Sequence, residues 1–126
     1  MNGDAARTYL NSRPDAWEDY PFGPDVCVFK IYKKMFATLG YEQDVAHINL
    51  KCDPEQALAL RDIFPAVLPG YHMNKAHWNT VVLDGSIPRG EIERMIDHSY
   101  GLVPKGLPKA QRHALKVRHG SDAVYR

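Results

Sequence analysis

The sequence predicts a single α+β domain in which an antiparallel sheet of about five strands packs against helices, in the order α-β-β-β-α-β-β-α. Two observations support this fold class. Short runs of β-branched and aromatic residues are separated by only a few polar residues, as in antiparallel hairpins. Other segments carry apolar residues at helical three- and four-residue spacing. The length of 126 residues and the hydrophobic content of 44% suit one core, so we expect one domain over residues 1–126.

The N-terminal part is expected to hold one short helix and one irregular segment. Asp4 is a suitable N-cap for a helix that runs through about residue 11. Pro14 then ends the helix, because proline disfavours helical backbone in the residue before it. Residues 17–24 contain two prolines and a glycine, so we expect no regular structure there.

Three strands are predicted next. Residues 26–31 and 35–39 are rich in β-branched and aromatic side chains, and the short polar connection Tyr32-Lys33-Lys34 makes them a hairpin. A turn over residues 40–44 leads to residues 45–51, where apolar and polar side chains alternate. Such alternation is typical of a strand that buries one face only.

The second half is predicted to alternate between helix and strand. Asp53, Pro54 and Gln56 form a strong helix start, so a helix is expected over residues 53–64. Two strands are predicted over residues 71–73 and 78–83. Residues 88–103 show the best amphipathic pattern in the chain. A last helix is expected over about 108–117, and the basic tail that starts at about residue 113 is expected to be frayed over residues 119–126.

Charge is distributed unevenly along the chain, although the net charge is only +1. Residues 1–104 contain ten basic and fourteen acidic side chains, whereas residues 105–126 contain six basic side chains and Asp122. A basic C-terminal segment favours polyanionic partners. Cys27 and Cys52 show no metal-binding spacing and are expected to be reduced. With no leader-like or membrane-spanning segment visible, a cytoplasmic protein without membrane contact is expected.

The most unusual segment is 71–80, which holds two histidines, two asparagines, a lysine, a tyrosine and a tryptophan. These side chains offer hydrogen-bond donors, a cation and flat rings, which suit phosphate and base contacts. The alternative is structural, with Asn74 and Lys75 as turn residues and Trp78 as a core aromatic. Lysines at the two hairpin tips, and Lys105 and Lys109 later, are either nucleic-acid contacts or ordinary solubilising charges.

Other chemistries receive less support. His72 and His77, with His47 nearby, are candidate metal ligands, but their spacing is unspecific. The adjacent acids Glu18 and Asp19 are more typical of a solvated loop than of acid–base catalysis. Because the sequence has no phosphate-binding glycine loop and no nucleophile elbow, we expect no catalysis, no cofactor and no metal.

Five segments carry a family resemblance: Glu18-Asp19-Tyr20-Pro21-Phe22-Gly23, Lys51-Cys52-Asp53-Pro54, Pro69-Gly70-Tyr71-His72-Met73-Asn74-Lys75, His77-Trp78-Asn79-Thr80-Val81 and Ser99-Tyr100-Gly101-Leu102-Val103. Over about residues 5–112 the chain resembles the MmcQ/YjbR proteins. It departs from them at Ala76, where a basic residue is expected in many members.

The resemblance implies a fold like that of the bacterial frataxin homologue CyaY and a "double wing" surface for DNA. It also raises iron binding through acidic residues near the first helix, which are spread too widely here to favour it. We therefore expect a non-enzymatic DNA-binding protein, and the alternative is a protein- or small-ligand-binding module that uses segment 71–79. The expected DNA contacts are Lys33, Lys34, His72, Lys75, His77, Trp78, Asn79, Lys105 and Lys109.

Overall fold

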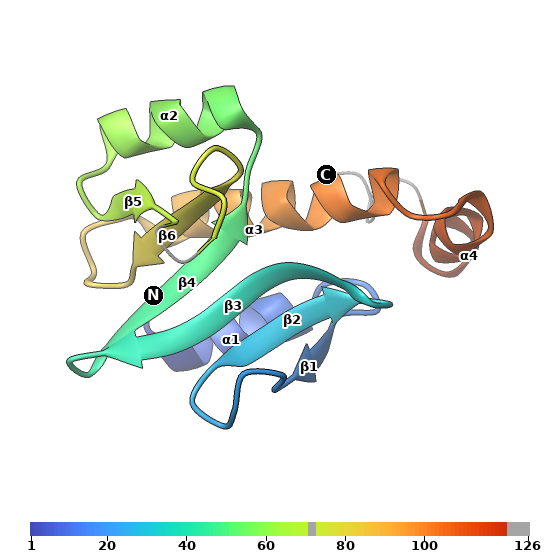
Figure 1. Cartoon of the computed structure of the whole chain (residues 1–126), viewed down its shortest axis with the longest axis horizontal. Coiled ribbons are helices and arrows are strands. Elements are labelled where there is room, and N and C mark those ends of the chain that lie inside the picture. The colour runs from blue at the N-terminus through green and yellow to red at the C-terminus, as the bar shows by residue number, and fades with distance from the viewer. Residues whose placement is uncertain (71–72, 121–126) are drawn as a thin grey trace.

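The computed structural model describes residues 1–70 and 73–120. Its centre is a six-stranded antiparallel sheet with the strand order β1-β2-β3-β4-β6-β5 (Figure 1). The strands are β1 (Trp17–Asp19), β2 (Cys27–Ile31), β3 (Lys34–Glu42), β4 (Val45–Lys51), β5 (Val67–Pro69) and β6 (Trp78–Val82). The predicted α+β class with an antiparallel sheet is confirmed, with one strand more than expected.

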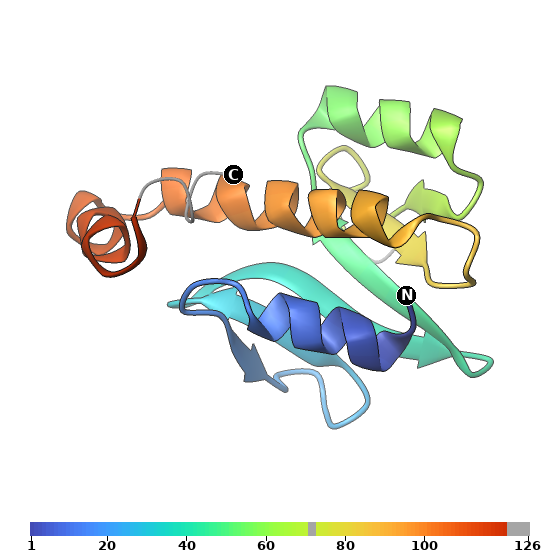
Figure 2. The ribbon, with the colours of Figure 1, turned by 180° about the vertical axis from the view of Figure 1, so that it is seen from behind.

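Helices line one side of this sheet. They are α1 (Gly3–Asn11), α2 (Pro54–Ile63), α3 (Arg89–Lys105) and α4 (Lys109–His119). Helices α1 and α3 lie side by side in front of β3 and β4 in Figure 2, and α2 packs against β5 and β6. Helix α3 extends past the sheet and leads into α4 at the far end of the molecule (Figures 1 and 2).

The buried residues form one core between the sheet and the helices. On β4 the alternation predicts the buried side correctly, because Ala46, Ile48 and Leu50 are buried and the residues between them are half-buried. A bulge between Phe29 and Lys30 shifts the β2–β3 register. It lets Phe36 join the core, where its ring packs edge-on against Tyr100 of α3 at 5.5 Å between centroids.

Ser99 joins α3 to the sheet by hydrogen bonds rather than by apolar contact. Its hydroxyl donates to the carbonyl oxygen of Phe36 at 2.6 Å and accepts from the backbone N–H of Lys51 at 2.9 Å. Ser99 is fully buried. It therefore satisfies two backbone groups, one on β3 and one on β4, that no water reaches.

The prediction that residues 17–24 lack regular structure is wrong at its start, because Trp17–Asp19 forms β1 on the outer edge of β2. Side-chain contacts hold this short strand. The indole N–H of Trp17 donates to the carbonyl of Tyr32 at 2.7 Å, and the amine of Lys30 lies 5.4 Å from the Trp17 ring centroid. The sequence hides these contacts because they join residues far apart in the chain.

The strand expected over 71–73 is also displaced. Strand β5 is Val67–Pro69, two residues after Pro65, and pairs with residues 79–81 in the middle of β6. Met73 lies in a bend, and residues 71 and 72 lie outside the described residues. Gly70 then approaches β6 so closely that an added Cβ would lie 2.8 Å from the Cβ of Trp78. The chain can take this path only with glycine at position 70.

Helix ends differ from expectation at both termini of the chain. The N-cap of α1 is Asn2 rather than Asp4, because the Asn2 side chain accepts from the N–H of Ala5 at 2.8 Å. The helix expected over about 108–117 is α4, which continues to His119 and so includes the first residues of the tail that was expected to fray. The fully buried Leu115 anchors that helix.

Cys27 and Cys52 are both buried and free, as predicted. Within residues 1–70 and 73–120, no helix is long and apolar enough to cross a membrane.

Candidate nucleic-acid interface

Two loops with cationic side chains project from the same end of the sheet. Strand β3 begins at Lys34, and β6 begins at Trp78. Both strands run antiparallel to β4, which lies between them and ends at Lys51 opposite Trp78. The β2–β3 turn and the β5–β6 loop therefore share one end of the sheet. We call this end, together with α4 beyond it, the basic end.

The β2–β3 turn presents Lys33 and Lys34, and both are exposed. The turn is tight because Tyr32 has a φ of 52°, in the left-handed region that non-glycine residues rarely adopt. Ile31 pairs with Lys34 across it. The two lysines predicted to contact DNA are thus held next to each other at the tip of a hairpin.

The β5–β6 loop is held in place by a short network. The side chain of Asn74 accepts from the N–H of Ala76 at 3.0 Å, and its carbonyl accepts from the N–H of His77 at 3.1 Å. The guanidinium of Arg61, on α2, donates to the carbonyl of Lys75. The Lys75 and His77 residues remain exposed. His72, the remaining histidine predicted here, lies outside the described residues.

The predicted contacts Trp78 and Asn79 need correction, because the structure buries them. Trp78 is 9% exposed and Asn79 is 2% exposed. The amide oxygen of Asn79 accepts from Arg61 Nε at 2.7 Å, and its amide nitrogen donates to the carbonyl of Ala57 at 3.3 Å. Of the alternatives for segment 71–80, the structural one holds for these two residues, which support the loop rather than reach a ligand on the surface.

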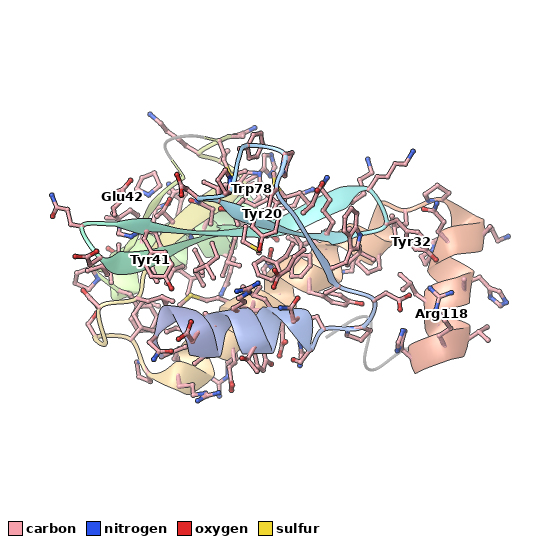
Figure 3. All side chains as sticks on the ribbon, turned by 90° about the horizontal axis from the view of Figure 1, so that it is seen from below. Tyr20, Tyr32, Tyr41, Glu42, Trp78 and Arg118 are labelled. Carbon is pink, nitrogen blue, oxygen red and sulfur yellow. The ribbon has the colours of Figure 1, made fainter. Side chains whose placement is uncertain are left out.

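Helix α4 adds the largest group of cations to the basic end. Its C-terminal turn is fixed on the α1–β1 connection, where Asp15 accepts from Arg118 and from His119. Arg118 also donates to the hydroxyl of Tyr32 at 3.1 Å, next to the Lys33–Lys34 tip (Figure 3). Cationic side chains on the α3–α4 corner and on α4 outside this contact are Lys105, Lys109, Arg112 and Lys116.

The predicted pair Lys105 and Lys109 is exposed at the α3–α4 corner, on the same end of the molecule as Lys33 and Lys34 (Figure 1). Arg112 and Lys116 belong to the basic C-terminal segment and were not among the predicted DNA contacts. Their four-residue spacing places them on one face of a helix, and that spacing was the signal that could have identified them.

The opposite end of the sheet is acidic. Glu42 and Asp44 lie in and beside the β3–β4 turn, on the side of the sheet opposite Tyr32 and Arg118 (Figure 3). Asp4, Asp25 and Asp84 are also exposed at this end. One shallow pocket here is lined by Asp4, Asp44 and Asp84, and a second one by Asp4 and Asp25. Exposed acidic side chains are therefore concentrated at this end of the strands, although Asp53 and Glu55, at the start of α2, lie at the basic end.

The described residues give no support to the metal sites that the sequence suggested. Among residues 1–70 and 73–120, no group of three or more histidine, cysteine or acidic side chains could hold a metal ion. His47 is not near His77, because it pairs with Val82 at the other end of β6. Three acids near the first helix are instead ion-paired: Asp15 with Arg118, Glu18 with Arg7, and Asp19 with Lys30.

Glu18, the first residue of the Glu18–Gly23 segment, joins β1 to α1 through hydrogen bonds. Its carboxylate accepts two hydrogen bonds from Arg7, at 2.6 and 2.7 Å, and one each from Asn11 and Tyr20. The hydrogen bonds from Arg7 lower the pKa of Glu18 to about 2. The side chain ties β1 to α1 and is an unsuitable general acid at neutral pH, since it stays ionised.

A groove lies between α2 and α3 on the helical side of the sheet. Its volume is about 260 Å3, and Asn79 of segment 71–79 is one of its lining residues. Other lining residues come from β4 and the two helices, among them Leu50, Gln56, Leu60, Met95 and His98. The walls of this groove come from α2 and α3, and the alternative of a ligand pocket formed by segment 71–79 stays a prediction.

Together these features define a class: a small α+β protein with a helix-backed antiparallel sheet and cationic loops at one end. Within that class, the chain belongs to the YjbR family, whose sequence profile matches residues 11–102. The match covers the sheet and most of α3, and it leaves out α4.

Relatives and solved structures agree with this assignment. The uncharacterised protein YbdF of Escherichia coli O157:H7 is 42% identical over 101 residues, which cover 80% of this chain and 81% of YbdF. The uncharacterised protein YjbR of E. coli K12 is 34% identical over 85% of this chain and 91% of its own length. The crystal structure of Deinococcus radiodurans DR2400 is 38% identical, with a TM-score of 0.83, over 91% of this chain and 88% of that protein. A Pseudomonas syringae protein is 35% identical, with a TM-score of 0.71, over 81% and 98%.

Proposed function

We propose that this protein binds duplex DNA through its basic end, without catalysing a reaction. The observation that carries the proposal is that the Lys33–Lys34 turn and the Lys75–His77 loop project from the same end of the sheet. Two cationic loops separated by β4 can contact phosphates on one duplex at two places. Phosphate contacts of this kind supply most of the affinity of sequence-independent binding.

The α3–α4 corner supports the same proposal. Lys105 and Lys109 are exposed beyond this end of the sheet, and Arg118 places α4 beside Tyr32 of the β2–β3 turn. The cations of α4 thereby extend the cationic surface of the β2–β3 turn. Five exposed acidic residues (Asp4, Asp25, Glu42, Asp44 and Asp84) lie at the other end, so they repel a polyanion at the basic end only weakly.

The burial of Trp78 and Asn79 makes the proposed mode more specific. With these two side chains inside the protein, the exposed side chains of the described loops include the cations Lys33, Lys34 and Lys75 and the ring of His77, which contact phosphates. Phosphate contacts position a protein but do not read base sequence. The proposed function is therefore binding with little dependence on DNA sequence and strong dependence on salt.

The decisive experiment is a salt series of duplex binding by fluorescence anisotropy. Each phosphate contact contributes about −0.9 to the slope of log K against log salt concentration. The triple variant Lys33→Ala/Lys34→Ala/Lys75→Ala is expected to bind more weakly and to reduce the slope by roughly 2 to 3 units. Lys105→Ala/Lys109→Ala is expected to reduce it by about 1 to 2 units.

A matched control is Arg89→Ala/Arg94→Ala, which removes two cations from α3 away from the basic end. These arginines pair with Glu93 and Glu91, and their removal should leave duplex affinity unchanged. The proposal is wrong if no duplex binds at about 50 mM salt, or if the control weakens binding as much as the triple variant does. Tighter binding to single-stranded DNA or to RNA would also contradict it.

A further inference from the structure

The groove between α2 and α3 arises from how the two helices divide the sheet. Helix α3 packs on β3 and β4, and α2 packs on β5 and β6. The strip where β4 meets β6 therefore lies between the helices, and Leu50 and Val81 form its almost fully buried floor. Leu60 of α2 and Met95 of α3 line the two sides, at 9% and 6% exposure. The inner surface of the groove is thus largely apolar.

The residues that line the groove carry a net positive charge. The charged ones are Lys51 at the end of β4 and the pair Arg94 and Glu91 on α3. Arg94 donates to Glu91 at 2.6 Å, so these two charges compensate each other. Lys51 has no ion-pair partner among residues 1–70 and 73–120. One positive charge of the lining therefore stays uncompensated.

Other ionisable groups do not offset the charge of Lys51. Burial lowers the pKa of His98 and raises the pKa of Cys52 to about 11, so both lining side chains are uncharged at neutral pH. Asp53 and Arg61, which bond to the lining residues His98 and Asn79, carry opposite charges and offset each other. The groove thus favours an anion over a cation.

Unused hydrogen-bond donors at the groove favour the same kind of ligand. Arg94, whose side chain is 78% exposed, spends one of its five N–H groups on Glu91. Neither the amine of Lys51 nor the amide of Gln56 has a hydrogen-bond partner in the part of the chain that the structure describes. A carboxylate accepts from such donors and also compensates a positive charge.

The apolar walls and the volume define the rest of the ligand. Leu60 and Met95 gain from contact with a hydrocarbon group, because it removes apolar surface from water. The volume of about 260 Å3 is slightly below the range of drug-sized sites. It suits a short hydrocarbon chain or a single ring.

We propose that the α2–α3 groove binds a small organic carboxylate with an apolar body. The apolar body lies between Leu60 and Met95, over the floor of the groove. The carboxylate lies at the mouth, where Lys51 and Arg94 donate to it. This site does not rest on the DNA proposal, because α2, α3 and the β4–β6 strip form it and the cationic loops do not.

The test is a titration of the 15N-labelled protein, without DNA, with four probes followed by two-dimensional NMR. Octanoate combines a carboxylate with an apolar chain, octanol has the chain without the charge, octylamine has the opposite charge, and acetate lacks the chain. Octanoate is expected to bind with a dissociation constant on the order of 1 mM and to shift the backbone signals of Leu60 and Met95. Octanol and octylamine should bind at least about fivefold more weakly, and acetate should give no saturable shifts.

Charge variants test the assigned donors. Lys51→Gln and Arg94→Gln are each expected to weaken octanoate binding about threefold, and the double variant about tenfold, with octanol binding unchanged. The matched control is Arg89→Gln, which removes a cation of α3 that does not line the groove. It should bind octanoate like the native protein.

A pair of tryptophan variants on α2 tests the location. Gln56→Trp places a large ring at the groove and is expected to weaken octanoate binding by about tenfold or more. Leu58→Trp places the same ring at a 64% exposed position that does not line the groove, and should bind octanoate like the native protein.

Several outcomes would overturn the proposal. One is the absence of saturable shifts with octanoate. Another is binding of octanol or octylamine as tight as that of octanoate, which would remove the role of the positive charge. A third is native octanoate affinity in the Lys51→Gln/Arg94→Gln variant or in Gln56→Trp, since binding would then occur elsewhere. Failure of DNA binding has no effect on these readouts, so the two proposals are tested separately.

Discussion

Arg61 Nε donates a hydrogen bond of 2.7 Å to the amide oxygen of Asn79, a side chain that is 2% exposed, and thereby joins α2 to β6. The same guanidinium reaches the carbonyl of Lys75. One arginine from a helix thus supports both the floor of the groove and the loop that presents a predicted DNA contact. Sequence inspection gave no indication of this role for Arg61.

Replacing Arg61 with leucine should lower the free energy of unfolding by about 1 to 3 kcal/mol, because the buried oxygen of Asn79 loses its charged donor. Urea unfolding followed by circular dichroism measures this change. Arg89→Leu on α3, whose side chain is 61% exposed, serves as the control and should change stability by less than about 0.5 kcal/mol. Equal effects of the two substitutions would contradict the assigned role.

Ser99→Ala is expected to cost about 1 to 3 kcal/mol of stability, since it leaves the carbonyl of Phe36 and the N–H of Lys51 without their shared partner. The measurement is again equilibrium unfolding. Ser86→Ala removes an exposed hydroxyl that bonds to Asp84 and is the matched control. A Ser99→Ala protein as stable as that control would show that the two backbone groups find other partners.

Glu18 should make stability depend on pH in the acid range. The pKa of its carboxyl is about 2 in the folded protein, against an ordinary value of 4.5, chiefly because Arg7 donates to it. A depressed folded-state pKa means that the contribution is complete above about pH 4.5 and is lost as the pH falls towards 2.

The measurement is the free energy of unfolding from pH 7 to pH 2 for the native protein and for Glu18→Gln. The variant should be less stable at pH 7, and the difference should shrink below about pH 4.5. Glu55→Gln, at an exposed position on α2, should follow the native curve. A constant difference between native protein and Glu18→Gln at all pH values would contradict the proposed ion pair.

Asp15 should control how firmly α4 is held. Burial favours the neutral acid, but hydrogen bonds from Arg118 and His119 hold the pKa of Asp15 below its usual value. Asp15 has a φ of 60°, which asparagine tolerates, so Asp15→Asn removes the charge without straining the backbone.

Hydrogen exchange of the α4 amides is expected to accelerate about threefold to tenfold in Asp15→Asn, while exchange in β3 and β4 stays unchanged. Asp25→Asn, at an exposed position near the other end, is the control. Unchanged exchange in α4 would mean that Leu115 alone fixes the helix. Uniform acceleration throughout the chain would indicate a loss of global stability instead.

Local patterns predicted much of the fold. Each successful prediction concerned one face or one end of a single element. These were the buried face of β4, the start of α2 at Asp53–Pro54 and the apolar face of α3. Strand β1 was missed because its stability comes from Lys30 and Tyr32, residues that are distant in sequence. Strand β5 was placed too late because a three-residue strand carries almost no periodic signal.

The site was predicted less completely, for a related reason. Cations at hairpin tips can be recognised from turn residues, so the exposed loop positions of Lys33, Lys34 and Lys75 were predicted correctly. Whether a polar side chain points outward depends on its partners, and no sequence pattern revealed that Arg61 and Ala57 bind Asn79. The groove was missed because its walls come from two helices whose separation depends on the whole sheet.

The segregation of acidic and basic residues to opposite ends of the strands gives the molecule an electric dipole despite its small net charge. In the field of a polyanion such a dipole experiences a torque, so an approaching molecule turns before it makes contact. Glu42, Asp44 and Asp84 then point outward into solvent. Once seated, each molecule would present a negative outer surface, which disfavours a second layer of the same protein above the first.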